Sequence, residues 1–414
     1  MAKKKKKSNQ TTVLIVIVIV LVLVVAAALA VVYVKDIGGM KDKVDKLLSL
    51  VAEEVDENSQ SGSNNSSQSG SQSGSNSSQN GGNGDQGKQN LSSDAGLSIH
   101  FLELGNAYAG DSVLLDCGDV EILIDAGSRA GSAATIKSYV DQYCTDGVLE
   151  YVIATHAHQD HIAGFVGTKA APGIFETYKC ETIIEFALTN STSSVYKNYC
   201  ATRDAEVADG AKCYTAAQCV KGENGAQKEY IIADGIKMTV LDNYYYYNKT
   251  SDENDYSVCV LIENGEQHYL FTGDLEKAGE SKLVELNDLP HCELYKGGHH
   301  GSYTASNDVL LNAVTPDNIC ICCCAGSDEY TSIPDNMFPA TASLERMVKH
   351  TTNIFVTTMY TGDDDDSDSF ASFNGNIVVT FEEGKVKVEG SANSVPLPYT
   401  EWCKEHRPTC YKGD

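Results

Sequence analysis

The sequence predicts a mixed α/β body in which two β-sheets pack together and helices cover their outer faces. Two observations lead to this prediction. Short apolar runs with the length and composition of strands recur between residues 98 and 389. Segments whose apolar residues recur at helical intervals separate many of these runs. A chain that mixes strands and helices in this way buries its sheets against one another and beneath helices.

Each element follows from its local pattern. We expect strands at 98–104, 112–115, 121–125, 149–154, 181–186, 237–241, 257–263, 267–272, 318–323, 353–357, 375–381 and 385–389. Helical spacing predicts helices at 132–143, 193–207, 276–285, 307–312 and 341–350, and a further helix begins near Asp160. The last two strands form a hairpin that closes a body spanning 96–390, with a tail at 391–414.

The first 57 residues form a separate module. A basic segment at 1–12 precedes residues 13–34, which contain no charge and would span about 33 Å as a helix. We expect one transmembrane helix, with the lysines in the cytoplasm and the body outside it. The alternative is a secretory signal cleaved near Ala30, which also exports the body. Residues 35–57 have helical spacing, and 58–95 form a disordered Ser/Gly/Asn/Gln-rich linker.

Charge and cysteine content narrow the function classes. The formal net charge is −26, and the N-terminal 57 residues carry an excess of lysine, so the body is strongly acidic. Such a surface repels polyanions and disfavours tight duplex-DNA binding. Of the 14 cysteines, Cys320, Cys322, Cys323 and Cys324 favour a buried strand over a metal cluster. Cys403 and Cys410 are the pair that we expect to form a disulfide.

The stretch "THAHQDH" at 155–161 carries the strongest chemical signal. An extended segment points His156 and His158 to one side, and Asp160 and His161 follow at a helix start. Imidazole and carboxylate ligands suit zinc and similar divalent ions. One loop can therefore hold parts of two metal sites.

Two later stretches offer the remaining ligands. Asp274 in "FTGDLE" follows a strand and can bridge two ions, although a helix N-cap is the alternative. "YKGGHHGSYTAS", which follows another expected short strand, brings His299 and His300. We expect His299 to be a metal ligand and His300 to be catalytic by assisting the leaving group, with Asp160 orienting the attacking water. Asp111 and Asp125 either orient imidazoles or are turn residues.

In their order along the chain, "LELGNAYAGDSVLL", "ILIDAG", "THAHQDH", "FTGDLE" and "GHHGS" resemble the metallo-β-lactamase superfamily. The pairing of "TGD" with "GHHGS" resembles the hydrolase domain of the DNA-uptake protein ComEC and its stand-alone relatives. This resemblance implies an αββα sandwich with a two-metal site at one edge of its sheets. It covers roughly residues 98–390.

Two departures from the family pattern matter. Residues 162–267 contain no histidine, a lack shared by ComEC-like proteins, so the ion held by His156 and His158 is expected to be the more open one. Relatives carry a His-Pro pair before the late helix, where this chain has Phe338. A substrate contact or proton donor is therefore missing at that place.

Together these features predict a membrane-anchored, extracytoplasmic hydrolase with two divalent ions, zinc being expected and manganese the alternative. Its expected substrate is a small or polymeric phosphodiester, either nucleic acid or a phosphorylated cell-envelope component. Substrate contacts are expected from Ser302, Tyr246 and Tyr247, the tyrosines by stacking. The alternative is an anchored metal-binding scaffold with an inactive site; β-lactam hydrolysis is a third, weaker hypothesis. The sequence does not fix the oligomeric state.

Overall fold

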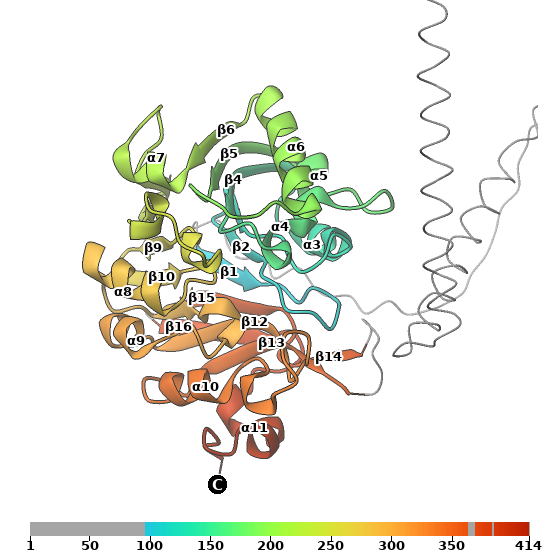
Figure 1. The fold of residues 1–414 in the computed structure, drawn as a ribbon, viewed down its shortest axis with the longest axis vertical. Helices are drawn as coiled ribbons and strands as arrows, with labels where there is room; N and C mark the ends of the chain where they lie inside the picture. The colour runs from blue at the N-terminus through green and yellow to red at the C-terminus, as the bar shows by residue number, and fades with distance from the viewer. Residues whose placement is uncertain (1–95, 363–368, 383–384, 414) are drawn as a thin grey trace, which may run out of the picture. The chain divides into compact units, whose positions relative to one another are not determined.

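Two eight-stranded β-sheets form the centre of the body (Figure 1). The computed structural model describes residues 96–362, 369–382 and 385–413. The predicted basic segment, transmembrane helix, juxtamembrane helix and linker lie outside the described residues. Among the helices that are described, none is long and apolar enough to cross a membrane.

The first sheet has the strand order β16-β15-β1-β2-β3-β4-β5-β6. Its strands from β3 to β6 run parallel, and the remaining neighbours are antiparallel. The bounds are β1 (Ser98–Phe101), β2 (Val113–Asp116), β3 (Glu121–Ile124), β4 (Val148–Ala154), β5 (Lys179–Glu185), β6 (Lys212–Thr215), β15 (Ile377–Glu382) and β16 (Lys385–Gly390).

The second sheet has the order β14-β13-β12-β11-β10-β9-β8-β7, and its strands from β10 to β13 run parallel. The parallel groups of both sheets matter below, because the site residues follow their carboxyl ends. The bounds are β7 (Glu229–Ala233), β8 (Ile236–Val240), β9 (Val260–Asn264), β10 (Gln267–Phe271), β11 (Leu294–Lys296), β12 (Asn318–Ala325), β13 (Ile354–Tyr360) and β14 (Phe370–Ser372).

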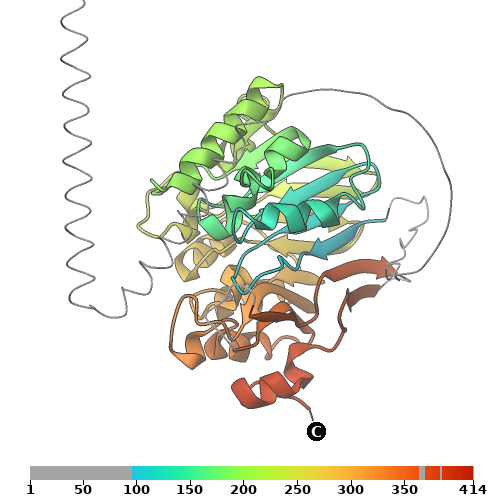
Figure 2. The same ribbon diagram turned by 90° about the vertical axis from the view of Figure 1, so that its right-hand side faces the viewer.

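Helices cover the sheets in two groups (Figures 1 and 2). The first sheet shares its hydrophobic cluster with α3, α4, α5 and α6, and the second sheet shares another cluster with α8, α9 and α10. The predicted two-sheet α/β architecture is therefore confirmed. The helix bounds are α3 (Ser132–Val140), α4 (Gln159–Val166), α5 (Ile174–Thr177), α6 (Ser194–Ala208), α7 (Ala216–Lys221), α8 (Lys277–Leu286), α9 (Asp308–Val314), α10 (Thr341–Met347) and α11 (Glu401–His406).

The cysteine-rich stretch is the buried strand β12, as predicted. All eight of its residues are buried. Cys320 and Cys322 belong to the cluster that both sheets share, whereas Ile319 and Ile321 belong to the cluster beneath α8–α10. This alternation is the period of two expected of a strand covered on both faces.

Two features of the C-terminus differ from the expected ones. The described part of the predicted tail, residues 391–413, packs on the body, because Leu397, Cys403 and Cys410 are fully buried in the cluster of the second sheet. Cys403 and Cys410 do not form a disulfide, since both are free thiols. The Cys403 thiol instead contacts the carbonyl of Arg407. Polar residues dominate this segment, so its few apolar residues did not indicate that it packs against the body.

Several short elements also escaped the sequence pattern. β6, β7 and β14 were not expected, and neither were α5, α7 and α11. β6 and β14 are three or four residues long and mostly half-buried or exposed, so they lack the apolar run that marks a central strand. The predicted strand at 257–263 begins three residues later, at Val260, because a short 3₁₀ turn (Asn254–Tyr256) precedes it.

Candidate metal centre

The predicted site residues follow the carboxyl ends of parallel strands. In the first sheet, Asp125 comes directly after β3 and His156 follows the neighbouring strand β4. In the second sheet, Asp274 follows β10 and His300 follows the neighbouring strand β11. Parallel neighbours end at the same edge of a sheet, where α/β proteins place their ligands. The topology therefore gathers residues that are far apart in the sequence.

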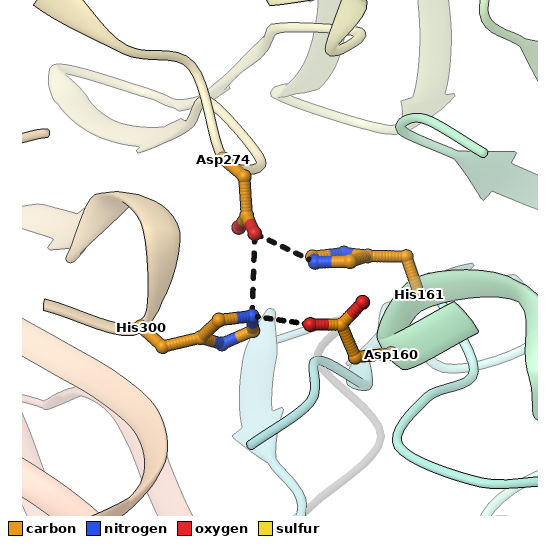
Figure 3. Close-up of side chains that lie close together, drawn as sticks. All are labelled: Asp160, His161, Asp274 and His300. Carbon is orange, nitrogen blue, oxygen red and sulfur yellow. Dashed lines mark hydrogen bonds and ion pairs between the residues drawn. The ribbon is translucent and has the colours of Figure 1, made fainter. Parts of the chain in front are cut away.

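Four side chains converge most closely, and we call Asp160, His161, Asp274 and His300 the inner cluster. One ligand atom from each lies within 4.8 Å of the others, and all four residues are buried. Figure 3 shows one carboxylate oxygen of Asp274 joined by dashed lines to both imidazoles. Its Oδ2 lies 2.9 Å from His161 Nε2 and 3.2 Å from His300 Nε2. His300 Nε2 is also 3.3 Å from Asp160 Oδ2.

The inner cluster fits a divalent cation. His300 Nε2 and Asp274 Oδ1 are buried and lack a hydrogen-bond partner of good geometry. Buried polar atoms are almost always satisfied, so two unsatisfied atoms in one cluster suit the binding of an ion or ligand. Two carboxylates and two imidazoles are also a donor set that zinc and similar ions accept. The residues present are therefore compatible with divalent metal binding.

The surrounding charges shift the pKa values of the imidazoles in and beside the inner cluster. Burial opposes a charged His161, but the carboxylates of Asp274 and Asp125 outweigh this and raise its pKa well above the ordinary value. For His300, the carboxylates of Asp274 and Asp111 likewise overcome burial and raise the pKa. Burial and the charge of His161 lower the pKa of His156 well below the ordinary value. Metal binding at such a centre displaces protons.

The backbone forms the turns that this arrangement needs. His299 and His300 have φ angles of 46° and 54°, in the left-handed region that non-glycine residues seldom adopt. Each such residue costs on the order of 1–3 kcal/mol, and such strain gathers at functional sites. The turn Gly298–Gly301 carries His300 into the buried cluster, whereas the side chain of His299 remains 20% exposed.

The start of α4 depends on close backbone contact. Asp160 and His161 lie in the first turn of this helix, and the carbonyl of Asp160 accepts a hydrogen bond from Asp111 N at 3.1 Å. A Cβ atom at Gly127 would lie 1.5 Å from the same carbonyl oxygen. Glycine at 127 therefore lets the β3–α3 loop pass directly beside the helix that carries two site residues.

Two buried aspartates and one backbone carbonyl face the imidazoles of the inner cluster. Asp125 Oδ2 lies 2.8 Å from His161 Nδ1. His300 Nδ1 lies 2.9 Å from the carbonyl oxygen of Cys322 and 3.2 Å from Asp111 Oδ1. Lys296 forms a buried ion pair with Asp111 and lies 3.8 Å from Asp274 Oδ1. Burial opposes a charged Lys296, but these two carboxylates raise its pKa above the ordinary value. Such contacts fix the ring orientation of metal-binding histidines.

Comparison with known proteins shows what this chain is similar to. The metallo-beta-lactamase superfamily matches residues 105–174. "Recombination protein 2" of Haemophilus influenzae is 26% identical over 221 residues, 53% of this chain and 23% of that protein. "Competence protein ComA" of Neisseria gonorrhoeae is 39% identical over 70 residues, 17% of this chain and 10% of that protein. "ComE operon protein 3" of Bacillus subtilis is 23% identical over 172 residues, 41% and 19% of the two chains.

The chain is therefore ComEC-like in sequence and matches the metallo-beta-lactamase superfamily at residues 105–174. It matches less than a quarter of the length of each of these relatives. Among solved structures, the metallo-beta-lactamase fold protein YhfI from Bacillus subtilis is 12% identical, with a TM-score of 0.37; the match covers 63% of this chain and 96% of that one.

The other predicted histidines of this ComEC-like site lie around the inner cluster. His156 is buried, and its Nε2 lies 4.0 Å from Asp274 Oδ2 and 3.0 Å from His158 Nδ1. His299 Nε2 lies 4.0 Å from the same Asp274 oxygen, and its Nδ1 lies 3.2 Å from Glu276 Oε1. Nitrogens of four histidines thus lie within 4.0 Å of one carboxylate oxygen.

The three predicted substrate contacts are placed differently from one another. Ser302 is buried, and its hydroxyl lies 2.9 Å from that of Thr304, within the same loop. Tyr246 is only 2% exposed, and its hydroxyl accepts a hydrogen bond from Cys259 N. Tyr247 is 39% exposed, with Lys221 over its ring at 4.4 Å. The interior thus already uses the hydroxyls of Ser302 and Tyr246.

Sequence reasoning missed three residues of this region: Lys296, Glu276 and Tyr330. Lys296 ends a fully buried strand, and a lysine in such a place was the signal that pointed to a buried ion pair. Glu276 follows "TGD" by two residues and contacts His299. Tyr330 donates a hydrogen bond to Asp160 Oδ2 at 2.8 Å across 170 residues of sequence, and no local pattern indicates that contact.

Proposed function

We propose that this chain is a membrane-anchored, extracytoplasmic hydrolase that uses two divalent metal ions to cleave phosphodiesters. One observation carries the proposal: the convergence of His156, His161 and His300 on a single oxygen of Asp274. A carboxylate shared in this way can bridge two ions. The proposal rests on this geometry and on the family resemblance.

The proposed ligand sets divide around Asp274. His156, His158 and Asp274 would hold one ion, and Asp160, His161, Asp274 and His300 the other. We assign His300 rather than His299 as the ligand, because His300 Nε2 is the buried, unsatisfied nitrogen beside two carboxylates. Zinc is the ion that this donor set favours, with manganese as the alternative.

Bound divalent ions would lower the pKa of a water and draw charge from an ester oxygen. The chain's own residues supply the rest. Asp125 holds the imidazole of His161 in place, and the carbonyl of Cys322 holds that of His300, with Asp111 beside it. His299 is partly exposed, and its Nδ1 lies 3.2 Å from Glu276 Oε1. It can therefore contact the substrate beside Asp274. Lys296 keeps the buried carboxylates of Asp111 and Asp274 from repelling one another.

Phosphodiesters are the proposed substrates because of the ComEC-like pairing of "TGD" with "GHHGS" and because the relatives' names refer to recombination and competence. Both names point to nucleic acid, and a phosphorylated envelope component is the second candidate. The anchor at 13–34 and its flanking lysines support the extracytoplasmic placement. Protease added to intact cells should cleave the body if this topology is correct; a body protected until lysis would contradict it.

The hydrolase proposal is tested on the full-length chain in detergent. Metal analysis should find close to two zinc or manganese ions per chain, and the loaded protein should hydrolyse bis(p-nitrophenyl) phosphate. Treatment with a strong chelator should abolish the activity, and added metal should restore it. Metal bound at this ratio without turnover of any ester class would favour the anchored scaffold instead.

A further inference from the structure

The loop between β12 and α10 places a half-exposed tyrosine directly on the inner cluster. Tyr330 donates its hydroxyl hydrogen to Asp160 Oδ2 at 2.8 Å, yet the residue as a whole is 54% exposed. A large ring is therefore fixed at its polar end to a buried carboxylate, while much of its apolar surface faces solvent. Tyrosine is suited to such a position, because its ring is rigid and its hydroxyl needs a partner.

The neighbouring residue fastens this loop to the first sheet. Glu329 Oε2 accepts a hydrogen bond from Ala109 N at 2.8 Å, and Oε1 forms an ion pair with Arg129. The guanidinium of Arg129 lies over the ring of Tyr108, 3.9 Å from its centroid. These contacts come from loops that follow β1 and β3. Tyr330 is therefore held in place before any ligand arrives, which lowers the entropy cost of binding.

A second ring supports Tyr330 from the side of the metal centre. The ring centroids of Tyr330 and Phe338 lie 5.4 Å apart, and Phe338 lies 5.8 Å from both His299 and His300. Phe338 is itself nearly buried. The aromatic rings thus form a row that leads from the inner cluster to solvent. Its outer member, Tyr330, has ring surface available for another flat group.

We propose that Tyr330 is the stacking platform for a flat ring of the substrate, so that the preferred phosphoesters are those of nucleotides. This proposal rests on the proposed function, and it specifies which phosphoester the site selects. The hydroxyl bond to Asp160 sets the ring beside the metal centre, so a base stacked there lies next to its own phosphate. Stacking needs no cationic track, which suits the acidic body.

We therefore assign to Tyr330 the stacking role that the sequence suggested for Tyr246 and Tyr247. Tyr246 is buried, and Lys221 lies over the ring of Tyr247. A purely structural role for Tyr330 would require mainly its hydroxyl bond, because 54% of the residue is exposed. The two roles are separable, since phenylalanine keeps the ring and loses the hydroxyl, whereas leucine loses both.

The experiment measures binding rather than turnover. Zinc-loaded full-length chain is titrated with adenosine 5′-monophosphate and with ribose 5-phosphate, which differ only in the base. We expect the nucleotide to bind roughly tenfold more tightly, as stacking of one base on an aromatic side chain gives. Tyr330→Leu should bring this ratio close to one. Tyr330→Phe and Tyr330→Trp should preserve it, and Tyr399→Leu, at an exposed tyrosine bonded to Thr352, is the matched control.

Two results would overturn the inference: equal affinities of the wild type for both ligands, or an unchanged ratio in Tyr330→Leu that still binds its metal. Hydrolysis of bis(p-nitrophenyl) phosphate is measured on the same preparations. Absence of turnover would contradict the proposed function while the binding ratio still decides the role of Tyr330. Turnover without a preference for the base would support the hydrolase function and contradict the stacking role of Tyr330.

Discussion

The inner cluster and the neighbouring His299 use the same residue types in different surroundings. His161 and His300 are fully buried; Asp125 faces Nδ1 of His161, and the carbonyl oxygen of Cys322 and Asp111 Oδ1 face Nδ1 of His300. His299 is partly exposed and contacts Glu276 and Thr304 instead. A buried, doubly held imidazole is ready to bind an ion, whereas an exposed one is free to meet a substrate. The difference teaches that position, not residue type, divides these roles.

Single substitutions of His299 and His300 test this comparison most directly. We expect His300→Ala to lose one metal per chain and to lower phosphodiesterase activity on the order of 10³-fold, about 4 kcal/mol of barrier. His299→Ala should keep both metals and lose roughly tenfold to 100-fold. Metal analysis and kcat/KM of the two variants provide the measurement. The reverse pattern would restore His299 as the ligand, as the sequence alone suggested.

The buried ion pair beneath the inner cluster should have the next largest effect. Lys296→Met leaves the buried carboxylate of Asp111 without its cation, and breaking a buried pair costs about 3–5 kcal/mol. Urea unfolding of the metal-free protein should show this loss. Adding Asp111→Asn should recover part of it, because the unpaired charge is then absent. Lys282→Met, at an exposed pair with Glu285, is the control and should change little.

Substitution of Asp125, which contacts Nδ1 of His161, tests whether this contact orients the imidazole or whether burial alone does so. Asp125→Asn preserves shape but weakens the contact with His161 Nδ1, so metal affinity should fall roughly tenfold to 100-fold. Competition with a chromophoric chelator measures the affinity. Asp141→Asn, at a partly exposed aspartate paired with Lys137, is the matched control. Equal affinities in the two variants would mean that burial alone orients His161.

Features set by local sequence could be predicted, whereas features set by tertiary contacts could not. The ligands of "THAHQDH" and the Asp274 strand end were accessible because local spacing places them, and β12 was accessible through its apolar run. The different placement of His299 and His300 depends on left-handed backbone angles that no pattern of letters reveals. Tyr330 meets Asp160 only through tertiary structure, across 170 residues. The candidate ligand types, and Asp111 and Asp125 beside them, were therefore open to prediction, whereas the turn at His299–His300 and the contact of Tyr330 were not.

The smallest predicted effect compares the carboxylates of the site with a buried one outside it. Imidazolium groups help to hold the pKa of Asp274 low despite burial, whereas Glu280 on α8 is buried without such partners. Burial raises the pKa of Glu280 to about 7, against hydrogen bonds from Asn307 that lower it. Because the folded state holds this proton more tightly than the unfolded chain, Glu280 should reduce stability as pH rises from about 4.5 to 7.

Glu280→Gln removes this titration. The fall in the free energy of unfolding between pH 5 and pH 8 should therefore be smaller in the variant than in the wild type, by roughly 1–3 kcal/mol. Urea titrations of both metal-free proteins at several pH values provide the measurement, and contributions from the site histidines cancel in the difference. Parallel curves would show that Glu280 is ionised in the folded protein throughout this range. The contrast between a carboxylate surrounded by imidazoles and one left alone would then rest on the inner cluster only.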